Sequence, residues 1–268
     1  MHFFLPDIYM TAINAAIDAS DAIMEIYRGN IERTIKKDGS PVTQADIKAS
    51  EIIATCLKQT GIPILGEELK KDPFSVRRQW SENWCVDPLD GTKMFLKRNG
   101  EFSVNIAHIV QGKATFGIIA NPVHRTVLVG GQDYGAYIIP FEEIENVNQW
   151  EKLHPKSKKN NPIKIICSWS YKEILKNETM ASLVQGGAHV HIRKGSALKF
   201  FDLCNGTVDL YPRFAPTMEW DIAAGQAILE TLGGAVLDLT TKAPLSYNKE
   251  DLFNPHFIAM TKPFIRES

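Results

Sequence analysis

Cysteine is scarce in this sequence, and its few cysteines are not arranged as metal ligands or redox pairs. The 268 residues include four, Cys56, Cys85, Cys167 and Cys204, with no C-x-x-C motif among them. Zinc sites of the common cysteine types and dithiol chemistry are therefore not expected, and free thiols in a reducing compartment are predicted. For Cys85 a redox role is the alternative to the favoured interpretation, a small residue buried in a strand.

Long hydrophobic runs and an excess of one charge are also absent. No apolar stretch approaches the roughly 20 residues that span a bilayer, and no basic segment with an apolar core and cleavage site opens the chain. Thirty basic and 31 acidic side chains give a formal net charge of -1, so no overall field favours nucleic acid. We expect a soluble cytoplasmic protein without an integral membrane segment, with peripheral contact to the cytoplasmic side of the inner membrane as the alternative.

The first half of the chain carries helix signals followed by strand signals. Apolar residues at helical spacing predict a helix over 7–27, and Thr43 with Asp46 resembles a capping box that starts a second helix near Gln44. Short apolar runs bounded by turn residues then predict strands of an antiparallel meander. They cover residues 63–66, 84–86, 103–110, 114–120 and 126–129.

The second half alternates between the two kinds of element. A polar stretch from Pro140 to Asn161 is the best candidate for a boundary or long surface connection, with the basic run Lys156 to Lys159 interpreted as a solvated loop. Strands are predicted at 163–167, 189–192 and 207–211, and helices at 171–183, 196–203 and 222–232. The pattern predicts one compact α+β unit over residues 1–268, with an N-terminal lobe over 1–140 and a C-terminal lobe over 162–268.

Two aspartates emerge where a predicted strand ends. Asp87, Pro88, Leu89, Asp90, Gly91 and Thr92 follow the apolar run 84–86. The short helical stretch that opens at Gly91 and Thr92 points unpaired backbone N–H groups at whatever precedes it, a setting that suits phosphate. Asp87, Asp90 and the Leu89 carbonyl offer the oxygen ligands that Mg²⁺ prefers. Alone the turn is moderately specific, because aspartates near proline and glycine are also ordinary turn formers.

Three further carboxylates gain meaning beside this turn. Glu67 and Glu68 end the run 63–66, where a pair of glutamates is usually solvated surface. Asp221 opens the predicted helix 222–232, where an aspartate is ordinarily a cap. Hydrolysis assisted by two or more metal ions needs carboxylates from separate elements, and these residues supply them.

In this order and spacing, three motifs resemble the inositol monophosphatase superfamily of metal-dependent, lithium-sensitive phosphatases. They are Gly66 to Glu68, Asp87 to Thr92, and Trp220 to Gly225. The flanks Lys93 to Phe102 and Leu210 to Phe214 are similar to its CysQ-type 3′(2′),5′-bisphosphate nucleotidase branch, as are Ser40 to Asp46 and Gly195 to Phe200. Met94 stands where that branch usually has glutamate.

The resemblance implies a sugar-phosphatase-like sandwich of αβαβα layers and a specific reaction. The branch removes the 3′-phosphate from adenosine 3′,5′-bisphosphate, giving AMP and phosphate, a step in sulfur metabolism. 3′-Phosphoadenosine 5′-phosphosulfate is a further candidate substrate. The partner expected is thus a small nucleotide bisphosphate, with the oligomeric state left open.

Residue by residue, the resemblance also implies the parts of the site. Two or three Mg²⁺ ions would be held by Glu67, Asp87, Asp90, Asp221 and the Leu89 carbonyl. Glu68 would orient a metal-bound water, while Thr92 with Asp46 would align and deprotonate the attacking water. The substrate contacts implied are Glu67, Leu89, Asp90, Gly91, Thr92, Gly195, Ser196, Lys199, Arg213 and Asp221.

The second phosphate of such a substrate needs local cations. Lys199 and Arg213 are the candidates, although each could be a surface charge that covers apolar neighbours. Lys93, Lys97 and Arg98 could form a positive rim or a solvated helix face.

His189 and His191 alternate as on one strand face, but a metal pair is rejected because nothing nearby supplies a third ligand. Two rival functions remain, an inositol or other sugar phosphatase and a non-catalytic regulator that binds metal and nucleotide.

Overall fold

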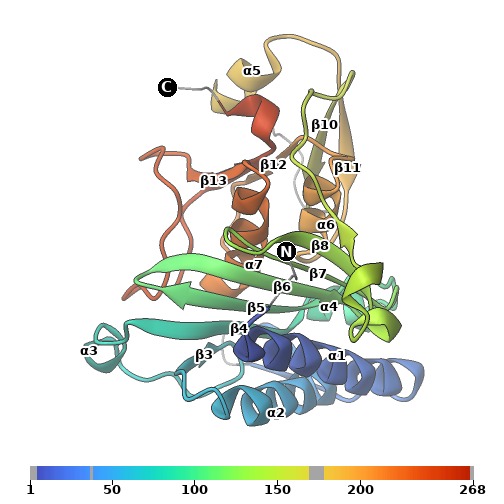
Figure 1. Ribbon diagram of the computed structural model, residues 1–268, viewed down its shortest axis with the longest axis vertical. Helices are drawn as coiled ribbons and strands as arrows, with labels where there is room; N and C mark the ends of the chain where they lie inside the picture. The colour runs from blue at the N-terminus through green and yellow to red at the C-terminus, as the bar shows by residue number, and fades with distance from the viewer. Residues whose placement is uncertain (1–4, 37–38, 169–177, 266–268) are drawn as a thin grey trace.

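The N-terminal helices form the outer layer of the molecule. The computed structural model describes residues 5–36, 39–168 and 178–265. Helix α1 (Asp7–Arg28) buries an alanine-rich face that includes Ala12, Ala16 and Ala19, and such small side chains allow α2 (Gln44–Lys58) to pack closely beside it. Thr43 and Asp46 form the predicted capping box at the start of α2. Both helices cover one face of a sheet (Figure 1).

That sheet has seven strands in the order β3-β4-β5-β6-β7-β8-β9. Its first pair is parallel and the others are antiparallel. The strands are β3 (Ile64–Gly66), β4 (Glu82–Asp90), β5 (Ser103–Val110), β6 (Lys113–Asn121), β7 (Thr126–Gly131), β8 (Gly135–Pro140) and β9 (Glu151–Lys152). Side chains on both faces of its central strands are buried, so each face must be covered by another layer.

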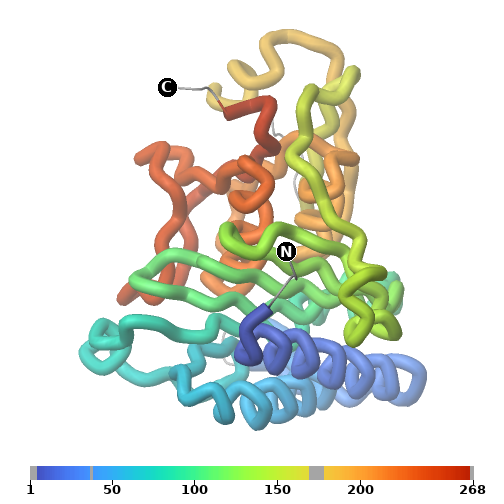
Figure 2. Tube along the Cα trace, in the orientation of Figure 1, coloured from blue at the N-terminus to red at the C-terminus, as the bar shows by residue number. Residues whose placement is uncertain are grey.

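The C-terminal half supplies the remaining layers. Helices α7 (Glu219–Thr231) and α6 (Lys199–Cys204) lie between the first sheet and a second one of five strands, in the order β11-β10-β12-β14-β13. These strands are β10 (Ile163–Cys167), β11 (His189–Arg193), β12 (Leu210–Arg213), β13 (Ala235–Asp238) and β14 (Phe257–Met260). Helix α5 (Glu178–Val184) packs on the outer face of this sheet. The chain trace passes from blue helices through green strands to orange and red elements, layer upon layer (Figure 2).

Close approach between α7 and the first sheet depends on glycine. A Cβ atom on Gly117 of β6 would lie 2.0 Å from the backbone oxygen of Ala224, and one on Gly225 would lie 2.2 Å from the Phe200 ring. Neither position has room for a methyl group, so these glycines allow α7 to sit tightly between β6 and α6. This packing fixes the first turn of α7, which carries Asp221.

Short elements complete the fold. A two-stranded hairpin pairs β1 (Arg33–Ile35) with β2 (Pro41–Thr43). The others are α3 (Phe74–Arg77), α4 (Thr92–Leu96) and the 3₁₀ turns η1 (Phe141–Glu143), η2 (Val147–Gln149) and η4 (Lys262–Phe264). Within the described residues, no helix is both long and apolar enough to cross a membrane.

The predicted α+β layering is confirmed, with differences in detail. Strands β8, β9, β13 and β14 and the β1–β2 hairpin were not predicted. The predicted helix 171–183 is described only from Glu178, because residues 169–177 lie outside the described residues. The helix predicted from Ser196 begins at Lys199, since Ser196 has a left-handed φ of 49° that an α-helix cannot include. The basic loop is not wholly solvated, because the Lys156 ammonium lies 2.9 Å from the buried Asp209 carboxylate.

Candidate active site

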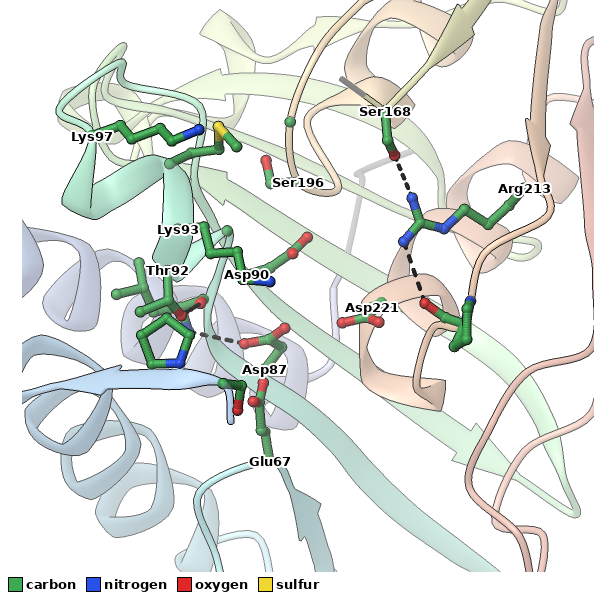
Figure 3. A pocket seen from close by; sticks show the side chains of 17 residues that line it. Glu67, Asp87, Asp90, Thr92, Lys93, Lys97, Ser168, Ser196, Arg213 and Asp221 are labelled. Atoms are coloured by element: carbon green, nitrogen blue, oxygen red, sulfur yellow. Dashed lines mark hydrogen bonds between the residues drawn. The ribbon is translucent and has the colours of Figure 1, made fainter. Parts of the chain in front are cut away.

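A cavity of about 750 Å³ opens between the end of β4 and the C-terminal half of the molecule. Its walls come from the loop after β3, the turn from β4 into α4, the segment before α6, the end of β12 and the start of α7. Figure 3 shows carboxylates from several of these elements pointing toward one another. A recess of about 100 Å³ adjoins the cavity and reaches Lys199 and Tyr211.

The turn from Asp87 to Asp90 is built by an interruption of the sheet. The pairing of β4 with β5 shifts register between these two residues, where Pro88 has no N–H to donate to the ladder. The Leu89 N–H instead donates to the Asp87 carboxylate at 3.0 Å. Both aspartates line the cavity as a result, and so does Leu89.

Asp221 is both a helix cap and a member of the carboxylate cluster. Helix α7 begins at Glu219, three residues earlier than predicted, so Asp221 stands in its first turn. Its Oδ2 accepts a hydrogen bond from the Met218 N–H at 2.7 Å. Oxygen atoms of Asp87, Asp90 and Asp221 nevertheless lie within 4.8 Å of one another. The two interpretations of Asp221 are therefore compatible.

Burial and mutual repulsion disfavour the negative charges of this cluster, so a nearby positive charge would stabilise it. Burial raises the pKa of Asp87 well above its ordinary value, and the nearby Glu67 and Asp90 charges raise it further. Burial, followed by the Asp90 charge, raises the pKa of Asp221 to about 7. Burial also raises the pKa of Asp90, although the Lys199 charge opposes the shift. A divalent cation would relieve this repulsion, and an all-oxygen donor set fits Mg²⁺.

Glu67 faces the cluster from the loop after β3. Its N–H donates to the Val86 carbonyl at 3.1 Å, which continues the β3–β4 pairing by one residue. Its carboxylate accepts a hydrogen bond from the Lys36 ammonium at 2.8 Å, and the same ammonium pairs with Glu68. Burial lowers the pKa of Lys36, but the two glutamates outweigh it and leave the pKa raised. Glu68 does not line the cavity.

Thr92 and Asp46 are joined across two elements. The Thr92 hydroxyl lies 2.9 Å from Asp46 Oδ1 and 3.3 Å from the Leu89 carbonyl. Asp46 Oδ2 accepts hydrogen bonds from the Thr43 N–H at 2.7 Å and the Thr43 hydroxyl at 2.6 Å. Burial raises the pKa of Asp46, while the hydrogen bonds from Thr43 and Thr92 oppose the shift. The capping box of α2 thus also orients the Thr92 hydroxyl.

Gly91 is required by its backbone. It precedes α4 with a φ of 96°, and a Cβ atom there would lie 2.8 Å from the Glu101 carbonyl. Only glycine adopts this conformation at little cost. The first helical hydrogen bonds run from the Met94 and Phe95 N–H groups to the Gly91 carbonyl, so the N–H groups of Thr92 and Lys93 precede them at the cavity wall.

The segment before α6 is pinned to the aspartate turn. The Ala197 N–H donates to Asp90 Oδ2, and the Gly195 N–H donates to the Glu101 carboxylate at 2.8 Å. These bonds hold Ser196 between them in its left-handed conformation, with its side chain toward the cavity (Figure 3). The structure therefore brings Gly195 and Ser196 into the same wall as Asp90.

Lys199 lies deeper than a surface charge would. Only 3% of the residue is exposed. Its ammonium donates to the carbonyls of Ser196 and Lys194 and lies 4.9 Å from the centre of the Tyr211 ring. Burial lowers the pKa of Lys199 to about 8, although Asp90 opposes the shift. Lys199 lines the inner recess and not the main cavity.

Arg213 lines both the cavity and the recess, and part of its guanidinium donates hydrogen bonds to backbone carbonyls. It donates to the carbonyls of Ala215 at 3.2 Å and Pro216 at 3.3 Å, and to the Ser168 hydroxyl (Figure 3). A guanidinium has five N–H groups, so two remain for another partner. Ser168 also lines the cavity.

The three basic residues near α4 have different positions. Lys93 and Lys97 line the cavity, together with Met94. Arg98 instead donates to the carbonyls of Tyr27 and Gly29 at the C-terminal end of α1. The suggested positive rim therefore contains the two lysines without Arg98.

Three residues at or beside the cavity were not predicted from the sequence. Lys36 pairs with Glu67, and Ser168 lines the cavity. The residues around them in the sequence give no signal for a site. Asn105 is directly opposite Asp87 in the β4–β5 pairing and donates to Asp90 at 3.4 Å. A polar residue inside the apolar run 103–110 was the available signal for it.

Outside the carboxylate cluster, the sequence drew attention to the four cysteines and to the histidine pair of β11. Cys85, Cys167 and Cys204 are buried, Cys56 is half-buried, and all four are free thiols. The His189 and His191 rings are 5.4 Å apart on β11. Among the described residues the clustered potential metal ligands are Asp87, Asp90 and Asp221.

Comparisons with known proteins agree with this geometry. The model of the inositol monophosphatase family matches residues 5–265. The chain is 40% identical over 249 residues to the 3′(2′),5′-bisphosphate nucleotidase CysQ of Salmonella typhimurium, covering 90% of this chain and 95% of that protein. The Escherichia coli K12 protein of the same name is 38% identical over the same shares.

Solved structures give the same result for the fold. The crystal structure of CysQ from Bacteroides thetaiotaomicron, described as a bacterial member of the inositol monophosphatase family, superposes with a TM-score of 0.82 at 37% identity. It covers 96% of this chain and 97% of that one. An inositol monophosphatase from Thermotoga maritima, 21% identical, has a TM-score of 0.75 over 96% and 93% of the two chains.

Proposed function

Because the chain belongs to the inositol monophosphatase family, we propose that it is a magnesium-dependent phosphatase of adenosine 3′,5′-bisphosphate. Water attacks the 3′-phosphorus, the bond from phosphorus to the 3′-oxygen breaks, and AMP and inorganic phosphate are formed. The relatives named 3′(2′),5′-bisphosphate nucleotidase support this substrate class. 3′-Phosphoadenosine 5′-phosphosulfate is a second candidate substrate of the same class.

The metal requirement rests on the donor set. Two or three Mg²⁺ ions would be held by Glu67, Asp87, Asp90, Asp221 and the Leu89 carbonyl, all hard oxygen donors at one cavity. When bound, such ions activate water and neutralise charge on the phosphoryl group and the leaving oxygen. The raised pKa values of Asp87 and Asp221 support the assignment, because burial and then the neighbouring carboxylates disfavour their charged forms, which a bound cation would stabilise.

Water activation is assigned to Thr92 and Asp46, with Glu68 as an orienting residue. The Thr92 hydroxyl donates to Asp46 at 2.9 Å, so its oxygen is free to accept a hydrogen bond from the attacking water. Asp46 has a raised pKa and is well suited to draw the proton away through Thr92. Glu68, which pairs with Lys36, would orient a water held at the same site.

Substrate binding uses opposite walls of the cavity. The N–H groups of Gly91 and Thr92 would hold the 3′-phosphate, and Gly195 with Ser196 would contact the nucleoside. The remaining N–H groups of Arg213 would meet the 5′-phosphate. Lys199 would act on the same phosphate from the recess, through its charge.

The single observation that carries the proposal is the carboxylate cluster at the head of a cavity of about 750 Å³. It is tested by phosphate release from adenosine 3′,5′-bisphosphate, adenosine 3′-monophosphate and inositol 1-phosphate, with Mg²⁺ and with EDTA. We expect the bisphosphate to have the highest kcat/KM and EDTA to abolish turnover. Equal kcat/KM for the bisphosphate and inositol 1-phosphate would support the sugar phosphatase instead, and absence of turnover with every substrate would support the non-catalytic regulator.

Arg213→Gln sharpens the substrate assignment. The variant removes the charge proposed to meet the 5′-phosphate, and charge-assisted hydrogen bonds contribute roughly 1.5–3 kcal/mol. We expect kcat/KM for the bisphosphate to fall by about 10- to 100-fold and that for adenosine 3′-monophosphate to change little. Equal losses with the two substrates would show that Arg213 acts only through Ser168 and the backbone.

Two broader features belong to the same proposal. The free thiols support a cytoplasmic location, which cell fractionation with detection of membrane-bound protein would test.

Glu67, Asp87 and Asp90 come from residues 1–140, whereas Asp221 comes from residues 162–268. Neither lobe should hydrolyse substrate when expressed alone.

A further inference from the structure

Lys71 connects the two chain segments that carry Glu67 and Asp221. Its ammonium donates to the Glu67 carbonyl at 2.8 Å. The same ammonium lies 4.9 Å from the centre of the Trp220 ring. Trp220 immediately precedes Asp221 in the first turn of α7, so a single cation contacts both segments.

The Glu67 segment needs this support more than the other proposed ligands do. Asp87 and Asp90 are on a strand of a seven-stranded sheet, and Asp221 is on a packed helix. Glu67 instead begins a loop, and its charge is repelled by the aspartates that it faces. Lys36 pairs with the Glu67 carboxylate, so Lys71 is the second cation on this segment and the one that holds its backbone.

The loop is shaped so that Lys71 returns to its own beginning. A Cβ atom on Gly66 would lie 3.1 Å from a methyl group of Leu69, so the Leu69 side chain folds back over Gly66. The turn brings the Lys71 ammonium back to residue 67, four positions earlier. The Trp220 residue beneath it is only 4% exposed, so the indole is a fixed platform for a cation–π contact.

We propose that Lys71 is a positioning residue for the metal site. Lys71 holds the Glu67 loop against the start of α7 before the ions bind. The inference rests on the metal ligands assigned under the proposed function. It adds a residue outside the cavity wall to the groups that set metal affinity. Residues that support ligands in this way commonly change affinity when they are replaced.

If Lys71 acted only through its charge, its replacement by a neutral residue would change Mg²⁺ affinity in the opposite direction. A lysine near a cation site repels the cation, so removal of its charge tightens binding if the charge acts only through space. Removal of an anchor weakens binding. The direction of the change therefore distinguishes the two roles.

The test measures Mg²⁺ binding by isothermal titration calorimetry on the full-length, metal-free protein without substrate. Lys71→Met removes the hydrogen bond and the cation–π contact, Lys71→Arg keeps both, and Lys70→Met removes the adjacent exposed lysine as a control. We expect Lys71→Met to raise the Mg²⁺ dissociation constant about three- to tenfold, at or below the lower end of the effect known for outer supporting residues. Lys71→Arg should remain within about twofold of the unmodified protein, and Lys70→Met should bind equally or more tightly.

A second readout separates positioning from loss of folding. Saturating Mg²⁺ should restore kcat in Lys71→Met, and its melting temperature in EDTA should match that of Lys70→Met. Unchanged or tighter Mg²⁺ binding by Lys71→Met would overturn the proposal, as would an equal weakening in Lys71→Arg. Since the calorimetry needs no turnover, failure to hydrolyse adenosine 3′,5′-bisphosphate would refute the proposed substrate without affecting this test.

Discussion

Replacement of Asp90 by asparagine is the sharpest test of the carboxylate cluster, because it should have opposite effects on stability and on activity. Carboxylate oxygens of Asp87, Asp90 and Asp221 lie within 4.8 Å of one another. Two full charges at that separation repel by about 3.5 kcal/mol at an effective dielectric constant of 20. Solvent at the open cavity reduces this value, and loss of the attraction between Asp90 and Lys199 reduces it further. We expect Asp90→Asn to stabilise the metal-free protein by about 1 kcal/mol at pH 8.5, or about 2 °C in melting temperature.

The effect has a defined pH dependence. Asp221 has a folded pKa of about 7, above its ordinary value, so the folded metal-free protein keeps a proton that the unfolded chain releases. This contribution to stability is complete below the unfolded pKa and is lost as pH rises toward about 7. After burial, the Asp90 charge is the second cause of the raised Asp221 pKa. Replacement of Asp90 should therefore reduce the stability that is lost as the pH rises. The difference between the variant and the unmodified protein should therefore be smaller at pH 5.5 than at pH 8.5.

The assay is thermal denaturation in EDTA and in Mg²⁺ at both pH values, combined with phosphate release. Mg²⁺ should stabilise the unmodified protein by binding its folded state. It should stabilise Asp90→Asn much less, and turnover should fall by more than about a hundredfold. Asp18→Asn, at an exposed position of α1, is the control for loss of one carboxylate. A metal-free Asp90→Asn protein less stable than the unmodified one at pH 8.5, but equally stabilised by Mg²⁺, would refute the reasoning.

Three further predictions concern the neighbouring groups. Thr92→Val removes the hydroxyl that bridges to Asp46 and should lower kcat by about 10²- to 10⁴-fold; a loss of Mg²⁺ affinity in calorimetry would instead show a structural role. Gly91→Ala places a methyl group 2.8 Å from a backbone carbonyl at a φ of 96° and should destabilise the protein by about 1–3 kcal/mol in thermal denaturation. Gly61→Ala, with a φ of 71° and no atom within 4 Å, should cost less, and equal costs would show that contact with the carbonyl is unimportant. Lithium should inhibit turnover at millimolar concentrations when titrated against Mg²⁺, and insensitivity would separate this enzyme from its family in that property.

Local patterns were enough to predict α1, α2 and much of the first sheet. The spacing of apolar residues along α1 and the capping box of Thr43 and Asp46 depend on neighbours within a few positions. Strands β5 and β6 were recognisable because turn residues bound both runs. Strands β13 and β14 were missed, since they complete a mixed sheet whose partners are distant in sequence and their own apolar runs are short.

The aspartate turn could also be predicted from the sequence, because Asp87 to Thr92 contains its own geometry. Pro88 interrupts the strand, Gly91 allows the left-handed residue, and the helix start follows at once. The spacing of Glu67 and Asp221 relative to this turn supported a shared metal site through resemblance. Their placement beside it depends on the β3–β4 pairing and on the packing of α7.

The sequence by itself thus predicted the kind of chemistry, carboxylates beside a turn suited to phosphate, since the aspartate turn is encoded in the contiguous residues Asp87 to Thr92. Only the tertiary structure decided which partners the lysine and arginine side chains contact. Lys199 is buried in the recess, Arg98 binds the end of α1, and Lys71 reaches Trp220. A lysine or arginine has a long flexible side chain whose partners are chosen by the fold, so its role cannot be inferred from its neighbours in the chain.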